Sequence, residues 1–314
     1  MRNSYTATMR TFISFVVLSS VSIAQAPLAF KASVRLVNIS FTVRDARGTL
    51  VTDLNKDDVE VLDDGTTQTI AFFARSQDLP LALGLLVDAS GSQQPFNKRH
   101  QHDLRQFLKS VLRPQDQAFL LCFGNHMRLA QDFTSSPADL AGSMSTCGSG
   151  RAPEIGPPEI RLLGTAFYDA LYYGATLKLA SIDHARRSLV IFSDGEDNSS
   201  AHHMLEAIEA AQTENAVVFG IRYTEIKHGR WTARNKYGMR VMERVARETG
   251  GTDFDAEKTD VKEAFRLIGE ELRSSYELAY HSTHSAGDGT FHKVVVRAKR
   301  PGLTVRTKTG YFSQ

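Results

Sequence analysis

The sequence predicts an α/β protein in which a doubly wound, mostly parallel sheet is inserted in, or flanked by, a small β-sandwich made from the N- and C-terminal strands. Two patterns indicate this. From residue 81 to residue 272, short apolar runs alternate with helical segments, which is typical of a parallel sheet covered on both faces. Before and after that region, period-two alternation between turn residues indicates antiparallel strands. A composition of 42% hydrophobic and 23% charged residues excludes a collagen, a coiled coil or a wholly disordered chain.

An export signal is predicted at the N-terminus, over residues 1–24. Arg2 and Arg10 precede about 14 mostly apolar residues, and small residues at Ser22 and Ala24 predict cleavage after Ala24. The apolar stretch is shorter than the roughly 20 residues that a membrane span needs, although an uncleaved membrane anchor is the alternative interpretation. We therefore expect an exported protein, periplasmic or secreted.

Charge and cysteine content exclude several classes of function. The chain has 37 basic and 35 acidic residues, and removing Arg2 and Arg10 with the signal leaves 35 of each. An even balance provides no basic field for nucleic acid. Two cysteines, Cys122 and Cys147, are too few for a disulfide scaffold and form no CxxC pair for structural zinc. An exported chain allows a bridge between them, and the sequence leaves its formation open.

The flanking strands are predicted from period-two alternation. Residues 34–44 form the first strand, and residues 59–62 and 69–74 form a hairpin around the Asp64-Gly65 turn. About three strands are few for an independently stable sheet. We therefore expect them to pair with later strands at residues 276–280, 291–299 and 303–309.

The central elements follow in alternation. The run at residues 81–87 is apolar throughout, as in a strand buried on both faces of a sheet. Further strands are predicted at residues 118–123, 127–133 (an edge hairpin), 188–193, 216–223 and 252–254, and helices at residues 93–112, 166–180, 201–214, 241–248 and 261–272. The expected parts are a signal peptide at residues 1–24, N-terminal strands at 31–78, the α/β domain at 79–283 and C-terminal strands at 284–314.

Oxygen-bearing side chains follow two of the predicted strands and precede one helix. Asp88, Ser90 and Ser92 come directly after the strand at 81–87, Thr165 precedes a helix, and Asp194 follows the strand at 188–193. Because ligands of open α/β sheets gather beyond the carboxyl ends of the strands, we expect these groups to converge. Carboxylates and hydroxyls suit a hard divalent cation, Mg²⁺ or else Mn²⁺ or Ca²⁺, and the absence of thiol and imidazole disfavours softer metals.

Three motifs occur in order along the chain: Asp88-x-Ser90-x-Ser92, Gly164-Thr165-Ala166 and the strand end Phe192-Ser193-Asp194-Gly195. Together they resemble the von Willebrand factor type A domain and its metal-ion-dependent adhesion site. The resemblance covers about residues 79–283 and implies a Rossmann-like sheet. It also implies that Ser90 and Ser92 ligate the cation directly, Thr165 directly or through water, and Asp88 and Asp194 through waters. One position would remain for the Asp or Glu carboxylate of a partner protein.

The flanks of this region are similar to an exported bacterial subgroup, the acidobacterial-type VWFA-related proteins. The similar segments are residues 57–65 before the domain, and residues 300–306 and 310–312 after it. Many type A domains have Met after the second serine, whereas this chain has Gln93-Gln94-Pro95. We expect this departure to change the loop packing beside the metal ligands.

The same residues allow other interpretations. Ser90 and Ser92 could merely cap the helix that follows them. A hydrolase could use a serine with Asp194 and Glu196, but no Gly-x-Ser-x-Gly elbow or phosphate-binding loop is present. We therefore expect a non-enzymatic, exported, metal-dependent protein-binding module. A structural subunit of an envelope complex, with a vestigial metal site, is the alternative.

Histidines and one basic loop complete the candidates. The histidine pairs form no HExxH motif and combine with no spaced cysteines, so surface exposure is expected rather than zinc binding. The loop at residues 225–237 holds the only Trp, Trp231, and could either recognise an acidic partner or simply be fixed to the body by that ring. The pairs are His100/His102, His202/His203 and His281/His284.

Overall fold

The computed structural model describes residues 36–75, 79–147, 151–157, 164–183, 185–225, 230–284, 287 and 289–313. The predicted signal peptide at residues 1–24 lies outside these ranges, as do residues 226–229 of the basic loop. Within the described residues, no helix combines the length and apolar character needed to cross a bilayer.

The N- and C-terminal strands are interleaved in two four-stranded sheets, ordered β13-β1-β11-β4 and β14-β12-β2-β3. Strand β1 lies between two strands from the end of the chain, antiparallel to both. The buried side chains of the two sheets form one core that includes Ile39, Val61 and Tyr280. The strands are β1 (Leu36–Arg44), β2 (Val59–Asp63), β3 (Thr66–Gln68), β4 (Ile70–Arg75), β11 (Tyr276–His281), β12 (Phe291–Ala298), β13 (Thr304–Thr307) and β14 (Gly310–Phe312).

Two details of this region differ from the sequence-based expectation. The Asp64-Gly65 turn joins β2 to the short β3, whereas β4 pairs with β11 in the other sheet. The chain passes from one sheet to the other between Gln68 and Ile70. Period-two alternation shows which residues are buried but not which sheet they join, so the sequence pattern does not predict this crossing. Strand β11 also belongs to these sheets, although the boundary at residue 283 assigned it to the α/β domain.

The α/β region confirms the predicted fold class. Its six-stranded sheet has the order β10-β9-β8-β5-β6-β7, and every neighbouring pair is parallel except the antiparallel edge pair β6 and β7. All residues of β5 are buried, as its apolar run predicted. The strands are β5 (Leu81–Asp88), β6 (Gln117–Phe123), β7 (Met127–Thr134), β8 (Arg186–Ser193), β9 (Val217–Arg222) and β10 (Asp253–Asp255).

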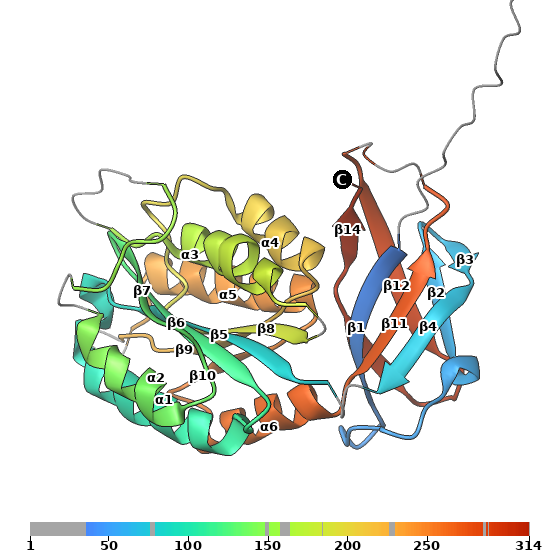
Figure 1. Cartoon of the computed structure of the whole chain (residues 1–314), viewed down its shortest axis with the longest axis horizontal. Coiled ribbons are helices and arrows are strands. Elements are labelled where there is room, and N and C mark those ends of the chain that lie inside the picture. Colours follow the sequence, from blue (N-terminus) through green and yellow to red (C-terminus); the bar gives the residue numbers. More distant parts are fainter. Residues whose placement is uncertain are drawn as a thin grey trace, which may run out of the picture. The chain divides into compact units, whose positions relative to one another are not determined.

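Helices cover both faces of this sheet (Figure 1). Leu104 and Phe107 of α1 pack with Phe265 of α6 in the core of one face. Phe167 of α3 and Val245 of α5 pack in the core of the other face. The helices are α1 (Asn97–Val111), α2 (Pro137–Ser143), α3 (Phe167–Tyr173), α4 (Met204–Thr213), α5 (Ala233–Thr249) and α6 (Val261–Arg273), with short 3₁₀ segments η1 (Lys56–Asp58), η3 (Gly91–Phe96), η4 (Met144–Thr146) and η6 (Leu179–Ser181) and a π segment η5 (Gly174–Lys178).

Two helices differ from the sequence-based prediction: α2 is not predicted, and α5 is longer than predicted. Helix α2 has only seven residues. It is capped by Ser136, whose side chain accepts a hydrogen bond from the Asp139 backbone N–H. Helix α5 begins at Ala233 behind the capping Thr232, so the second half of the predicted loop at 225–237 is helical. Its polar first turns carry too weak an apolar pattern to show this in the sequence.

A disulfide joins Cys122 of β6 to Cys147, which follows η4. The bridge ties the segment that holds α2 to the central sheet. It therefore constrains the chain over a sequence separation of 25 residues.

The expectation of surface histidines is wrong for His100. Its ring is fully buried in helix α1, with its centroid 4.4 Å from that of Tyr223. Within the described residues, neither ring nitrogen has a hydrogen-bond partner. Burial, together with the nearby Arg99 charge, lowers the pKa of His100 from 6.5 to about 3.

We expect His100 to make the fold acid-sensitive. The pKa of His100 is about 3 in the folded chain and about 6.5 in the unfolded chain. As the pH falls below 6.5, the unfolded chain is therefore protonated first. The folded state loses stability as the pH falls from 6.5 toward 3. The loss should approach roughly 1.4 kcal/mol per pH unit. His100→Phe should flatten urea-unfolding free energies across this range, and the exposed His102→Gln should not. Parallel pH profiles for wild type and His100→Phe would contradict this assignment.

Candidate metal centre

Two carboxylates meet at the carboxyl edge of the central sheet because of strand register. Strands β5 and β8 are parallel neighbours, with Val87 opposite Phe192. Asp88 is the last residue of β5, and Asp194 directly follows the last residue of β8. Their exposed fractions are 0% and 4%. Adjacent strand ends thus place two acidic side chains beside each other and away from water.

Asp88 is held by hydrogen bonds to both carboxylate oxygens. Its Oδ1 accepts from the Ser90 backbone N–H at 2.9 Å, and its Oδ2 accepts from the Ser193 hydroxyl at 2.6 Å. Burial, and after it the neighbouring negative charge of Asp194, raise the pKa of Asp88 to about 7 despite the hydrogen bonds from Ser193 and Ser90, which lower it. A shift of this kind marks a site where negative charge is poorly compensated.

Asp194 is oriented by a residue whose role the sequence did not reveal. The Gln93 side-chain amide donates to Asp194 Oδ2 at 2.9 Å and to the Tyr223 carbonyl at 3.1 Å, and Gln93 is fully buried. Asp194 Oδ1 accepts from the Glu196 backbone N–H at 3.0 Å. In the part of the chain that the structure describes, no basic side chain forms an ion pair with Asp88 or Asp194. The only signal for Gln93 was its place where many type A domains have Met.

Ser90 and Ser92 present their hydroxyls to each other rather than to the helix. Their Oγ atoms lie 3.2 Å apart. Ser90 stands at the cap position of η3, yet its side chain makes no capping hydrogen bond. The capping interpretation therefore lacks support for Ser90. Adjacent oxygen ligands of an octahedral cation at about 2.1 Å lie about 3.0 Å apart, close to the separation of these hydroxyls.

Thr165 lies on the loop that meets this edge, and it is buried. Its backbone N–H donates to Asn198 Oδ1 at 2.8 Å, and its carbonyl accepts from the Asn198 N–H at 3.1 Å. Gly164 has a φ of 130°, and a Cβ there would stand 2.6 Å from Asn198 Oδ1, so the turn requires glycine. Among the described residues, no hydrogen bond joins Thr165 to the other four predicted ligands. The structure thus links Asp88, Ser90, Ser92 and Asp194 by direct contacts or charge, and Thr165 only through the loop that carries it.

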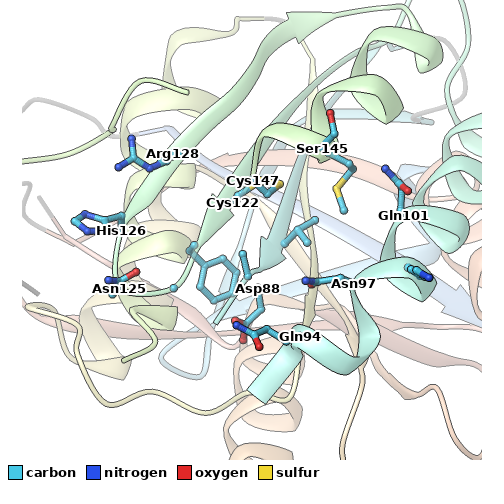
Figure 2. Close-up of a pocket in the computed structure, with 16 residues that line it drawn as sticks. Asp88, Gln94, Asn97, Gln101, Cys122, Asn125, His126, Arg128, Ser145 and Cys147 are labelled. Carbon is cyan, nitrogen blue, oxygen red and sulfur yellow. A yellow bond between two sulfur atoms is a disulfide. The ribbon is translucent and has the colours of Figure 1, made fainter. Parts of the chain in front are cut away.

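A cavity of about 560 Å³ opens beside Asp88 (Figure 2). Figure 2 shows Asn97 and Gln101 of α1 on one side and His126 and Arg128 on the other. Arg128 binds Glu154 at 2.8 Å, which offsets part of the positive charge of this wall. The lining is mostly polar, as expected for a surface that meets another polar group rather than an apolar ligand.

The remaining candidates around this edge have structural partners. Glu196 pairs with Arg234 of α5, while burial and Asp194 raise the pKa of Glu196. His202 binds the buried Asp169 at 2.7 Å. Trp231 is half-buried, with the Lys258 ammonium 5.1 Å from its ring centroid.

No protein-family model and no curated protein matches this chain. Several solved structures are similar to it. The mussel byssus proximal thread matrix protein 1, whose MIDAS motif is occupied by zinc, is 12% identical over 68% of this chain and 50% of that chain, with a TM-score of 0.48. The manganese-loaded TRAP protein of Plasmodium vivax is 14% identical over 80% and 98%, with a TM-score of 0.46. A von Willebrand factor type A protein from Catenulispora acidiphila is 13% identical over 90% and 75%, with a TM-score of 0.45.

The doubly wound sheet and the motif residues at its carboxyl edge agree with the resemblance to the von Willebrand factor type A domain. Identities of 12–14% leave the function to be argued from the chain's own residues.

We expect Gln93→Leu to destabilise the fold by about 2–3 kcal/mol, because Asp194 and the Tyr223 carbonyl would each lose a buried donor. Urea unfolding in EDTA measures this. The matched control is Gln94→Leu, since Gln94 is exposed and should change stability by less than about 0.5 kcal/mol. Equal effects of the two substitutions would show that the amide of Gln93 does not orient Asp194.

Proposed function

We propose that this chain is an exported, non-enzymatic binding protein that holds a divalent cation, Mg²⁺ or else Mn²⁺ or Ca²⁺, through Asp88, Ser90, Ser92, Thr165 and Asp194. Through that cation it would engage an Asp or Glu carboxylate of a partner protein. The observation that carries the proposal is the buried pair of Asp88 and Asp194, which has no counter-cation among the described side chains.

The donor set fits a hard divalent ion. Two carboxylates side by side in a poorly solvated edge repel each other, and a cation between them would remove that repulsion. The hydroxyls of Ser90 and Ser92 add neutral oxygens at a separation of 3.2 Å. All five side chains offer oxygen, and Mg²⁺ binds oxygen and keeps several waters.

Each residue has a definable task in this scheme. Ser193 and the Ser90 backbone N–H fix the orientation of Asp88, while Gln93 and the Glu196 N–H fix that of Asp194. Because Ser90 and Ser92 are uncharged, they would leave the bound ion with net positive character. The ion would then supply an open coordination position for a carboxylate oxygen from outside.

Three features support the remaining parts of the proposal: the predicted signal, the disulfide and the polar cavity. The predicted signal at residues 1–24 and the bridge between Cys122 and Cys147 both suit an oxidising compartment outside the cytoplasm. Ser90 and Ser92 would serve as metal ligands, a role that removes them as nucleophiles. The polar cavity is lined by Asp88, alone among the five predicted ligands, and would leave room for a partner side chain at this edge.

Metal titration tests the site. Calorimetry of the purified protein with Mg²⁺ or Mn²⁺ should show one binding event that Asp88→Ala weakens at least tenfold. Asp183→Ala is the matched control, because Asp183 is exposed and precedes β8 at the opposite edge of the sheet. No binding, or binding unchanged in Asp88→Ala, would defeat the adhesion proposal and favour an assembly subunit with a vestigial site.

Partner capture tests the function. Immobilised protein incubated with envelope extract should retain a partner in Mg²⁺ and lose it in EDTA, because the bound ion would hold the partner's carboxylate. Asp88→Ala should lose the partner in Mg²⁺, and Asp183→Ala should keep it. Capture that persists in EDTA and in Asp88→Ala would place the contact elsewhere. A turnover activity lost in Ser90→Ala without loss of fold would favour an enzyme.

A further inference from the structure

A second cluster of side chains that could bind a metal ion lies in the β-sandwich rather than at the carboxyl edge of the central sheet. Asp63, Asp64, His284 and His292 each offer one ligand atom, and the four atoms lie within 4.8 Å of one another. Asp63 ends β2, Asp64 begins the turn to β3, and His292 lies in β12 of the same sheet. His284 follows β11 of the other sheet. The cluster therefore joins the two sheets.

The Asp63 carboxylate has one oxygen that accepts hydrogen bonds and one that accepts none among the described residues, an arrangement that suits a metal ligand. Its side chain is fully buried. Oδ2 accepts from the hydroxyls of Tyr280 at 3.0 Å, Tyr311 at 2.8 Å and Ser282 at 3.3 Å. Oδ1 is buried without a hydrogen-bond partner in the described part of the chain, and so is His284 Nε2, which faces it at 3.5 Å. Leaving such atoms unpaired is costly, and a shared ion would satisfy both.

His292 is oriented through its second nitrogen. Its Nδ1 lies 2.8 Å from Asp64 Oδ2, and its Nε2 lies 3.0 Å from the Thr290 hydroxyl. A hydroxyl can donate or accept, so either neutral tautomer of the ring keeps this partner. With the proton on Nε2, the lone pair of Nδ1 points toward the two aspartates, the arrangement typical of metal-binding histidine. The ring of His284 stacks on that of His292 at 3.9 Å.

We propose that Asp63, Asp64, His284 and His292 form a structural site for a divalent first-row transition ion of the Zn²⁺ class. Two imidazoles and two carboxylates suit Zn²⁺ and differ from the all-oxygen set of Asp88. Ligands of a tetrahedral Zn²⁺ at about 2.05 Å lie about 3.3 Å apart. His284 Nε2 stands 3.5 Å from Asp63 Oδ1 and 3.4 Å from Asp64 Oδ2, close to that edge.

Binding would exchange a hydrogen bond for a coordinate bond. In the metal-free chain the short Nδ1 contact of His292 to Asp64 requires a proton between them. On binding, the neutral ring would change tautomer: Nδ1 would give up its proton to solvent and Nε2 would take one up, so that no net proton is lost. The Nδ1 lone pair would then face the ion, while Nε2–H would donate to the Thr290 hydroxyl. The ion would then link the β2–β3 turn and β12 to the segment after β11, which adds a tie between sheets where hydrogen-bonded strand pairing provides none.

Cobalt substitution tests this site on the whole protein. One equivalent of Co²⁺ should give the strong visible bands of four-coordinate cobalt, and excess Zn²⁺ should abolish them. At Zn²⁺ a hundredfold above Kd, Tm should rise by roughly 5–10 °C. His284→Gln should lose the bands and weaken Zn²⁺ binding at least tenfold. His281→Gln is the matched control, since His281 is exposed at the end of β11 and outside the cluster.

The outcomes separate this site from the one at Asp88. Bands that persist in Asp88→Ala and vanish in His284→Gln support the proposal, whatever Mg²⁺ does. Bands that vanish in Asp88→Ala and persist in His284→Gln would overturn it. Absence of the bands, or Zn²⁺ binding unchanged in His284→Gln, would also overturn it and leave the four side chains as a hydrogen-bonded cluster.

Discussion

The arrangement of Asp88 and Asp194 depends on the pairing of β5 with β8. Parallel neighbours end at the same edge of a sheet, so acidic residues that follow both strands are forced together. This repulsive pair is buried. Ser193, Gln93 and two backbone N–H groups hold the two carboxylates in place by donating hydrogen bonds to them. Groups that are hydrogen-bonded into an unfavourable charge arrangement are typical of sites prepared for a cation.

Much of the fold could be predicted because buried strands leave a strong signal. The apolar run that forms β5, together with the strand-helix alternation after it, is enough to predict the class of sheet. The prediction is wrong where the hydrophobic pattern carries no information, as in the choice of strand partners. The sequence correctly predicts the Asp64-Gly65 turn but wrongly predicts that β4 pairs with β2, because burial alternates in the same way in both sheets of a sandwich.

The candidate site was partly predictable for the same reason. Residues that directly follow a strand can be placed at its end, and Asp88 and Asp194 lie there. Gln93 could not be assigned, since nothing in its neighbours shows that its amide reaches Asp194 across the sheet edge. His100 was read as a surface residue because a helix face cannot be oriented from so polar a segment. The cluster of Asp63, His284 and His292 joins strands far apart in sequence and has no motif spacing.

The bridge between Cys122 and Cys147 gives the cavity beside Asp88 a dependence on where the chain matures. Both cysteines line that cavity, one from the sheet and one from the segment after α2. Under oxidising conditions, a covalent bond would join the cavity-lining segment that holds Cys147 to strand β6, which holds Cys122. The same chain under reducing conditions would keep the ligands but hold that segment by packing alone. If the protein is exported as proposed, formation of this bridge would thus complete the shape of the surface that the proposed partner would contact.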